Sequence, residues 1–227
     1  MAENEVTEGE MPTVHIEVVS DVVCPWCYIG KRRLEGAIAL SPDVNVEVNF
    51  RPYFLNPWIP REGIDRQVYL ETKFGSAERY TAIAERVGTA AAMEGLVYNP
   101  QKMSRQPNTL DCHRLILWSR GATDPARMKQ KLMELYFADG ADLSDPKVLI
   151  QAAIDCGMDG DLVRRLLASD AEIDRIEAEA TAAKEAGIDG VPCFVFGGSV
   201  IVTGAQSPEY LASAIERTSG RHTRLRA

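Results

Sequence analysis

Strand-like alternation of apolar and polar residues is confined to the two ends of this chain, and this distribution constrains the fold most strongly. Residues 14–18 alternate with the period of two that a strand requires, and residues 44–51 repeat the pattern. Between them, residues 27–38 carry apolar side chains at helical spacing. Near the other end, residues 193–196 and 199–202 flank a Gly-Gly pair, which is typical of a β-hairpin. The chain therefore begins as β-α-β and ends around a hairpin.

The segment between these two ends is patterned as helices. Asp124-Pro125 and Asp145-Pro146 each place a capping aspartate before a proline at the first helical position. Apolar periodicity predicts further helices over about residues 67–86 and 110–120. The prolines at 55–61 and 97–108 predict loops.

Two more helices flank the terminal hairpin. Residues 169–172 have the Ser-x-x-Glu pattern of a capping box and predict a helix that Gly187 ends, and Ser207-Pro208 opens a last helix. Because the first strand pair needs a right-handed crossover and the hairpin can extend the same sheet, both ends can share one sheet. We expect an α/β fold with a core at 12–60 and 172–218, an inserted all-helical domain at 61–171, and flexible tails at 1–11 and 219–227.

Cys24-Pro25-Trp26-Cys27 lies where the first strand gives way to the first helix. A thiolate at this position meets unpaired N–H groups and the positive end of the helix dipole, which lower the pKa of Cys24. Pro25 fits the first helical position, where no N–H is needed, and Trp26 shapes the rim. Cys27, almost one turn later, is close enough to form or resolve a disulfide. The pair predicts thiol-disulfide chemistry.

A Cys-x-x-Cys pair can also be half of a zinc site, and a non-catalytic metal-binding module is therefore an alternative. Zinc needs further ligands, and the candidates Cys112 and His113 are adjacent on a predicted helix and so point apart. We expect no metal. Cys112, Cys156 and Cys193 are interpreted as core residues, and His113 as a structural one, since a thiolate at a helix start needs no general base. Asp21 either caps the turn before the motif or tunes its thiols, and capping is favoured.

Composition restricts the classes of partner. With 25 Lys+Arg against 33 Asp+Glu the formal charge is -8, which argues against nucleic acid. No apolar run approaches the ~18 residues of a membrane span, and residues 1–8 are acidic where a secretory signal is basic. Five cysteines are odd in number and too sparse for a framework of disulfides. We expect a cytoplasmic protein without a membrane partner.

The residues around the cysteine pair resemble the DsbA family of the thioredoxin-fold superfamily, in its FrnE-like, 2-hydroxychromene-2-carboxylate isomerase-like branch. Residues 20–30 look like the active-site stretch of that branch and residues 54–57 like the exit of its second strand. Residues 190–192 and 202–206 are similar to its C-terminal signature, so the resemblance covers about residues 14–217. It implies a thioredoxin fold whose helical insertion covers the active-site face.

The resemblance also implies roles for single residues. Cys24 would be the nucleophile, Cys27 the resolving thiol, and Pro192 a cis proline whose preceding residue, Val191, offers backbone hydrogen bonds to an extended substrate. Asn56 is expected to line the cleft. Related isomerases and kappa-class glutathione transferases carry serine in place of Cys24, so cysteine here favours exchange with a thiol or disulfide, in a protein or a small molecule. A glutathione-dependent isomerase or transferase for a small aromatic is the alternative. No cofactor is expected beyond the redox pair, with glutathione a candidate co-substrate.

Cys193 departs from this branch, which typically carries a larger apolar residue after the cis proline. Strand alternation points its side chain away from that of Pro192, so we expect a small core residue and not a third redox thiol.

Overall fold

The structure, a computed structural model, describes residues 11–220 except the side chain of Ala77. The predicted tails at 1–11 and 219–227 lie largely outside these residues. The first elements are β1 (Thr13–Ser20), α1 (Pro25–Ala39), β2 (Asn45–Pro52), β3 (Ile64–Asp65), α2 (Arg66–Phe74), α3 (Ala77–Met93), a 3-10 turn (Pro100–Lys102) and β4 (Arg105–Gln106). They are followed by α4 (Leu110–Ser119), α5 (Pro125–Phe137), α6 (Pro146–Asp155), α7 (Gly160–Leu167), α8 (Ile173–Glu185), β5 (Cys193–Phe196), β6 (Val200–Thr203) and α9 (Pro208–Thr218).

The two ends of the chain form one sheet, as their alternation predicts. Within the described residues its strand order is β2-β1-β5-β6, with β1 parallel to β2 and antiparallel to β5. The register places Val18 beside both Phe50 of β2 and Phe194 of β5. Strand β1 therefore ties the first half of the fold to the last.

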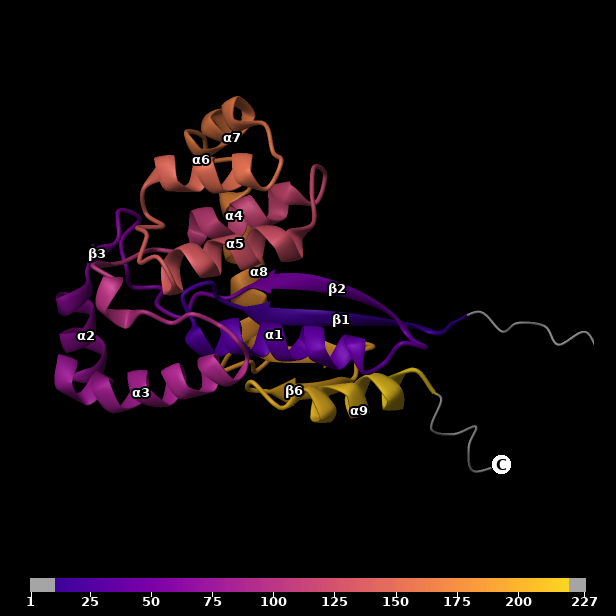
Figure 1. Ribbon diagram of the computed structural model, residues 1–227. Helices are drawn as coiled ribbons and strands as arrows, with labels where there is room; N and C mark the ends of the chain where they lie inside the picture. The colour runs from indigo at the N-terminus through magenta and orange to yellow at the C-terminus, as the bar shows by residue number, and fades with distance from the viewer. Residues whose placement is uncertain (1–10, 221–227) are drawn as a thin grey trace, which may run out of the picture.

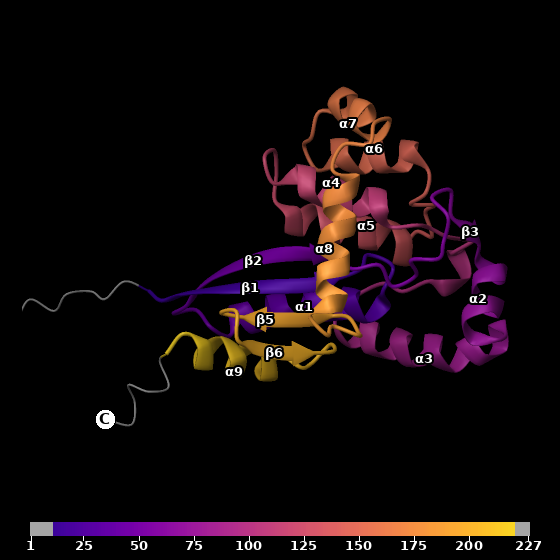
Figure 2. The same ribbon diagram turned by 180° about the vertical axis from the view of Figure 1, so that it is seen from behind.

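Helices cover both faces of this sheet. Helices α1 and α9 lie on one face, and α8 crosses the other (Figures 1 and 2). Ile16, Leu34 and Phe194 belong to the core on the α1 side, whereas Val19 and Cys193 pack with Tyr53 and Ala183 on the α8 side. This three-layer arrangement with helices α2 to α7 between β2 and α8 is the predicted thioredoxin fold with a helical insertion; the exact domain bounds stay a prediction.

The inserted helices form two groups. Helices α4 to α7 are stacked beside the β2 edge, while α2 and α3 lie at the end of the sheet where β1 hands over to α1 (Figure 1). Arg114 of α4 is fully buried and donates hydrogen bonds to the carbonyl oxygens of Leu166, Ser169 and Ala171. Arg114 therefore fixes the end of α7 and the segment that connects α7 to α8.

Two of the predicted helix boundaries are wrong. The single helix expected over 67–86 is split between α2 and α3, because Gly75 ends α2 with φ at +84° and the Ser76 hydroxyl caps α3. The capping box at 169–172 does not form: Glu172 has φ at +65°, and the Ser169 hydroxyl donates to Leu166 O at the end of α7. Helix α7 and the short β3–β4 pair were not predicted.

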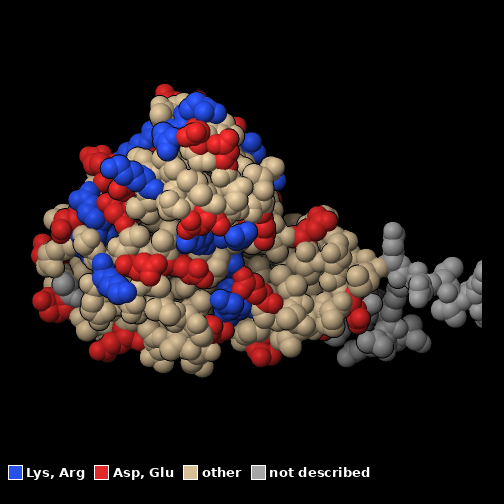
Figure 3. Space-filling model, turned by 45° about the horizontal axis from the view of Figure 1, so that its top comes forward, with Lys and Arg blue, Asp and Glu red and all other residues tan. Residues whose placement is uncertain are grey.

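Charges of both signs are interspersed over the helical layer (Figure 3). On that face of the described residues, acidic and basic side chains alternate and no continuous basic surface is seen. None of the helices between residues 11 and 220 combines the length and the apolar character that a membrane crossing requires.

The fold predicts that Gly30 of α1 cannot be replaced without moving the strand opposite. A Cβ at this position would lie 2.8 Å from Pro192 Cγ and 3.3 Å from Phe194 Cζ. We expect Gly30→Ala to lower the free energy of unfolding by about 1–3 kcal/mol, measured by urea denaturation.

Gly88→Ala is the matched control, since its Cβ would meet its nearest atom, Tyr98 Cδ1, at 3.9 Å inside helix α3. That substitution should stabilise the protein by up to about 1 kcal/mol. A Gly30→Ala protein as stable as the parent would contradict the close packing of α1 against β5.

Candidate active site

Cys24 occupies the N-cap of α1, directly after the turn that follows β1. Its N–H donates to Asp21 O at 3.3 Å, and its carbonyl accepts from the N–H groups of Cys27 and Tyr28 at 3.0 and 3.2 Å. Pro25 stands at the first helical position, as expected. The Cys24 sulfur therefore lies beside helix-terminal N–H groups, and Trp26 is half-buried at the edge of the core.

The two thiols of the motif are not equivalent. Both are buried and free. The pKa of Cys24 is lowered, first by a hydrogen bond from the Cys27 side chain and then by backbone N–H groups, which together outweigh burial and the charge of Asp21. The pKa of Cys27 is raised well above its usual value by burial and by the neighbouring Cys24. Cys24 is thus the thiol that ionises first.

The start of β5 lies against the start of α1. The Val191–Pro192 peptide bond is cis, as the resemblance implies, and Cys24 Sγ donates a hydrogen bond to Val191 O at 3.6 Å. Gly30 faces the ring of Pro192. Residues from the two ends of the sequence thereby meet at one thiol.

Asp21 does not cap its own turn, so the favoured expectation for it is wrong. Its Oδ2 accepts a hydrogen bond from Leu55 N at 2.8 Å, which ties the β1–α1 turn to the segment after β2. Its Oδ1 has no hydrogen-bond partner among the described residues and lies 3.5 Å from His113 Nε2. His113 is itself buried, with Nε2 3.2 Å from Tyr53 O. The carboxylate is therefore enclosed behind the cysteine pair, where its charge opposes ionisation of Cys24.

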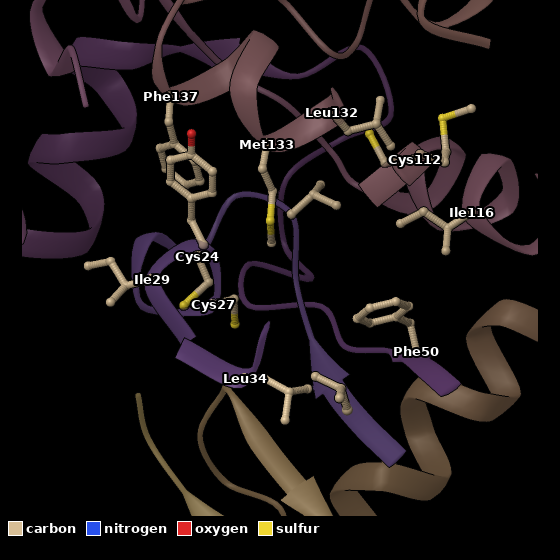
Figure 4. Close-up of a cluster of buried hydrophobic side chains, with 14 of the residues drawn as sticks. Cys24, Cys27, Ile29, Leu34, Phe50, Cys112, Ile116, Leu132, Met133 and Phe137 are labelled. Carbon is tan, nitrogen blue, oxygen red and sulfur yellow. The ribbon is translucent and has the colours of Figure 1, made fainter. Parts of the chain in front are cut away.

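Helix α5 of the insertion lies over the pair. Met133 and Phe137 point toward the start of α1 (Figure 4), and the Phe137 ring stacks on Tyr28 with centroids 5.1 Å apart. Apolar side chains of α5 thus pack against the start of α1.

Lys129 of α5 is a charged neighbour that our reading of the sequence missed. Its side chain is 1% exposed, its Nζ has no hydrogen-bond partner among the described residues, and it lies 5.2 Å from the centroid of the Phe50 ring. Burial lowers the pKa of Lys129 to about 8, although the charges of Cys27 and Asp21 raise it. The one sequence signal is a lysine one turn before Met133 and two turns before Tyr136, on a face that is otherwise apolar.

Asn56 is buried, bonds to a lysine of α2 and also lines a cavity. Its Oδ1 accepts a hydrogen bond from Lys73 Nζ of α2, and the residue lines a cavity of about 300 Å³ bounded also by Phe54, Asn108 and Lys184. Lys73 lies near enough to Cys24 for a thiolate there to raise its pKa, although burial has the larger, lowering effect.

The remaining cysteines are core residues, as expected. Cys112, Cys156 and Cys193 are all buried, and burial raises the pKa of each thiol. In the part of the chain that the structure describes, no group of three or more His, Cys, Asp or Glu side chains could hold a metal ion.

Comparison with known proteins places this geometry among related chains. Residues 15–216 match the family described as the DSBA-like thioredoxin domain. The chain is 32% identical to a probable DsbA oxidoreductase from Streptomyces coelicolor, with a TM-score of 0.83 over 91% of this chain and 90% of that one. An uncharacterized protein, YwbO of Bacillus subtilis, is 27% identical over 89% of this chain and 96% of its own length. A 2-hydroxychromene-2-carboxylate isomerase shares the fold at 15% identity and a TM-score of 0.68, over 93% of this chain and 98% of its own.

The site predicts that Cys24 ionises below the usual thiol value of about 8.5 and that a donor at position 27 is the main reason. Serine can replace that donor and alanine cannot. We therefore expect a lower Cys24 pKa in Cys27→Ser than in Cys27→Ala, read from thiolate absorbance at 240 nm against pH. Equal values in the two variants would contradict the assigned cause.

Lys129 makes the stability of the fold depend on pH. Its pKa is about 8 in the folded protein, against about 10.4 for a lysine in an unfolded chain. Between these values the unfolded state binds more protons, so the contribution of Lys129 to the free energy of unfolding rises with pH. Relative to Lys129→Met, the parent should gain up to about 3 kcal/mol between about pH 7 and about pH 10.5.

Urea denaturation in a Cys24→Ser, Cys27→Ser background measures this gain without titration of the two motif thiols, and the other three thiols contribute equally to both proteins compared. Removing the two thiols, whose charges raise the pKa of Lys129, leaves the direction unchanged. Lys131→Met is the control, because a hydrogen bond to Asp155 raises the pKa of Lys131 and no gain is expected over that range. A stability difference for Lys129→Met that does not change with pH would contradict the burial of a titrating lysine.

Proposed function

We propose that this chain, which belongs to the family of DSBA-like thioredoxin domains, is a thiol-disulfide oxidoreductase whose redox pair is Cys24 and Cys27. The observation that carries the proposal is the unequal ionisation of the two thiols, with Cys24 lowered at the helix start and Cys27 raised behind it. In such a pair the thiol with the lower pKa attacks a disulfide first, and the other thiol resolves the mixed disulfide.

In the reducing direction the Cys24 thiolate attacks one sulfur of a substrate disulfide. A mixed disulfide forms with Cys24, and the other substrate sulfur leaves as a thiolate. The Cys27 thiolate then attacks Cys24 Sγ, which closes the Cys24–Cys27 disulfide and releases the second substrate thiolate. The pair is oxidised by two electrons and the substrate disulfide is reduced by two. In the oxidising direction the same steps run in reverse.

Val191 is proposed to change its partner during the reaction. Its carbonyl accepts a hydrogen bond from the protonated thiol of Cys24, and this bond is lost when that thiol ionises. The carbonyl is then available to an N–H group of an extended substrate, with Pro192 beside it to fix the direction of the chain.

Lys129 is proposed to assist the second step. Cys27 must lose its proton before it can attack, and its buried position opposes the resulting negative charge. The positive charge of Lys129 favours that thiolate and lowers the pKa of Cys27. A Cys27 thiolate in turn raises the pKa of Lys129, so the two groups lie within electrostatic reach of each other. Lys129 therefore acts through Cys27, by stabilising the thiolate form of the resolving thiol.

The substrate is proposed to be a thiol or disulfide of a protein or a small molecule, with glutathione as a candidate co-substrate. Lys73 places a cation within electrostatic reach of Cys24, which suits the carboxylates of such a thiol. The isomerase or transferase alternative is not favoured, because a second thiol behind Cys24 is not needed for that chemistry.

A reducing compartment, such as the cytoplasm, is proposed as the site of action. Cys112, Cys156 and Cys193 are unpaired and buried, so no disulfide among them contributes to the fold.

Trapping variants test the division of roles. Cys27→Ser should attack a disulfide-bonded protein and retain it as a covalent adduct that reductant removes, because the resolving thiol is missing. Cys24→Ser should retain none, since the four remaining thiols are buried and have raised pKa values. Non-reducing gels and intact mass measure both.

Cys193→Ser is the matched control and should behave as the parent, because that thiol lies on the α8 side of the sheet. Adducts on Cys24→Ser would reverse the assigned roles. Adducts on neither variant would remove the proposed function.

A further inference from the structure

A second cavity lies between α2, α3 and residues 98–101, away from the cysteine pair. Its volume is about 390 Å³, and its walls include Leu70, Ala84 and the rings of Tyr80 and Tyr98. Neither cysteine of the motif contributes to the lining, so the thiol chemistry makes no use of this space.

The guanidinium of Arg66 forms one side of this cavity and is held between aromatic rings. Its Cζ lies 4.9 Å from the centroid of Tyr69 and 5.1 Å from that of Tyr80. Its Nη1 donates to Gln106 Oε1 and, at 3.2 Å, to Tyr136 OH. The remaining donors of the guanidinium, on Nε and Nη2, make no hydrogen bond to the described residues.

Arg66 carries a positive charge that the fold does not neutralise. In the part of the chain that the structure describes, no carboxylate forms an ion pair with Arg66. Most of the arginines in that part are ion-paired with a carboxylate. Burial raises the pKa of Tyr69, Tyr98 and Tyr136, so these neighbouring hydroxyls are uncharged at neutral pH. A half-buried cation without a countercharge is costly, and an anion that enters the cavity would relieve that cost.

The walls decide what kind of anion fits. Rings and aliphatic side chains suit an apolar body, and Tyr80 and Tyr98, whose hydroxyls lie 2.6 Å apart, add a polar point beside it. The exposed carboxylate of Glu85 also borders the cavity and disfavours a ligand with several negative charges. A planar group with one charge matches the fork of a guanidinium.

We propose that this cavity is a binding site for a small organic monocarboxylate, whose carboxylate pairs with Arg66 and whose apolar body lies between α2 and α3. The inference goes beyond the proposed redox function and does not depend on it. The site shares no residue with the cysteine pair, so each can fail without the other.

Calorimetric titration with benzoate tests the site, with the neutral isostere benzamide and inorganic phosphate as comparison ligands. Benzoate should bind saturably and at least about tenfold more tightly than benzamide, since a charge-assisted hydrogen bond is lost in the amide. Benzamide binding as tightly as benzoate, or phosphate binding in place of benzoate, would overturn the assignment.

Two variants locate the binding. Arg66→Met should weaken benzoate binding at least about tenfold. Because Arg66 also bonds to Gln106 and Tyr136, a second variant, Ala84→Leu, fills the cavity and leaves the guanidinium in place. It should abolish binding, whereas Ala82→Leu, on the exposed part of the same helix, should not change it.

The redox site provides the last control. Cys24→Ser should bind benzoate as the parent does, because the thiol does not line the cavity. Benzoate binding that survives Ala84→Leu, or that is lost in Cys24→Ser, would place the ligand elsewhere and overturn the proposal.

Discussion

The approach of Pro192 to Gly30 is the contact on which the geometry around Cys24 depends. A Cβ at position 30 would lie 2.8 Å from the proline ring, so helix α1 can lie this close to the start of β5 only through a glycine. Strand β1 positions both partners of this contact. It pairs with β5 through Val19 and Cys193, and it leads directly into the cysteine motif at the start of α1. The result is a carbonyl, Val191 O, held 3.6 Å from the sulfur of Cys24.

Buried charges then connect the helical insertion to this core. Arg114 has its donors satisfied by three carbonyl oxygens and the carboxylate of Asp111, so its burial stabilises the join between α7 and α8. Lys129 Nζ and Asp21 Oδ1 differ, since neither has a hydrogen-bond partner among the described residues. Unsatisfied buried polar groups are unfavourable for folding. Here they lie near the cysteine pair, where Lys129 lowers the pKa of Cys27 and Asp21 raises that of Cys24. The insertion thus contributes an electrostatic influence as well as a cover.

Much of the fold could be predicted because its signals are local. Asp124 and Asp145 cap the helices that begin at the prolines after them, and the Gly-Gly pair at 197–198 forms the turn of the expected hairpin. Where a local signal failed, a distant group intervened: Arg114 binds the carbonyl of Ser169, inside the segment that was expected to open a helix. The split between α2 and α3 is local instead, because Gly75 in the left-handed region ends α2 and the Ser76 hydroxyl caps α3, while the apolar spacing continues across both.

At the site, local helix geometry positions the cysteine motif, and contacts between distant segments position its charged neighbours. The order of residues alone placed Cys24 at a helix start, Pro25 at the first helical position and Cys27 one turn later, because helix geometry acts over a few neighbouring residues. Only the folded chain brings Leu55 N to the carboxylate of Asp21 and Lys129 within electrostatic reach of Cys27. Electrostatic influence depends on distance and burial in space, and the segments that meet there are far apart along the chain.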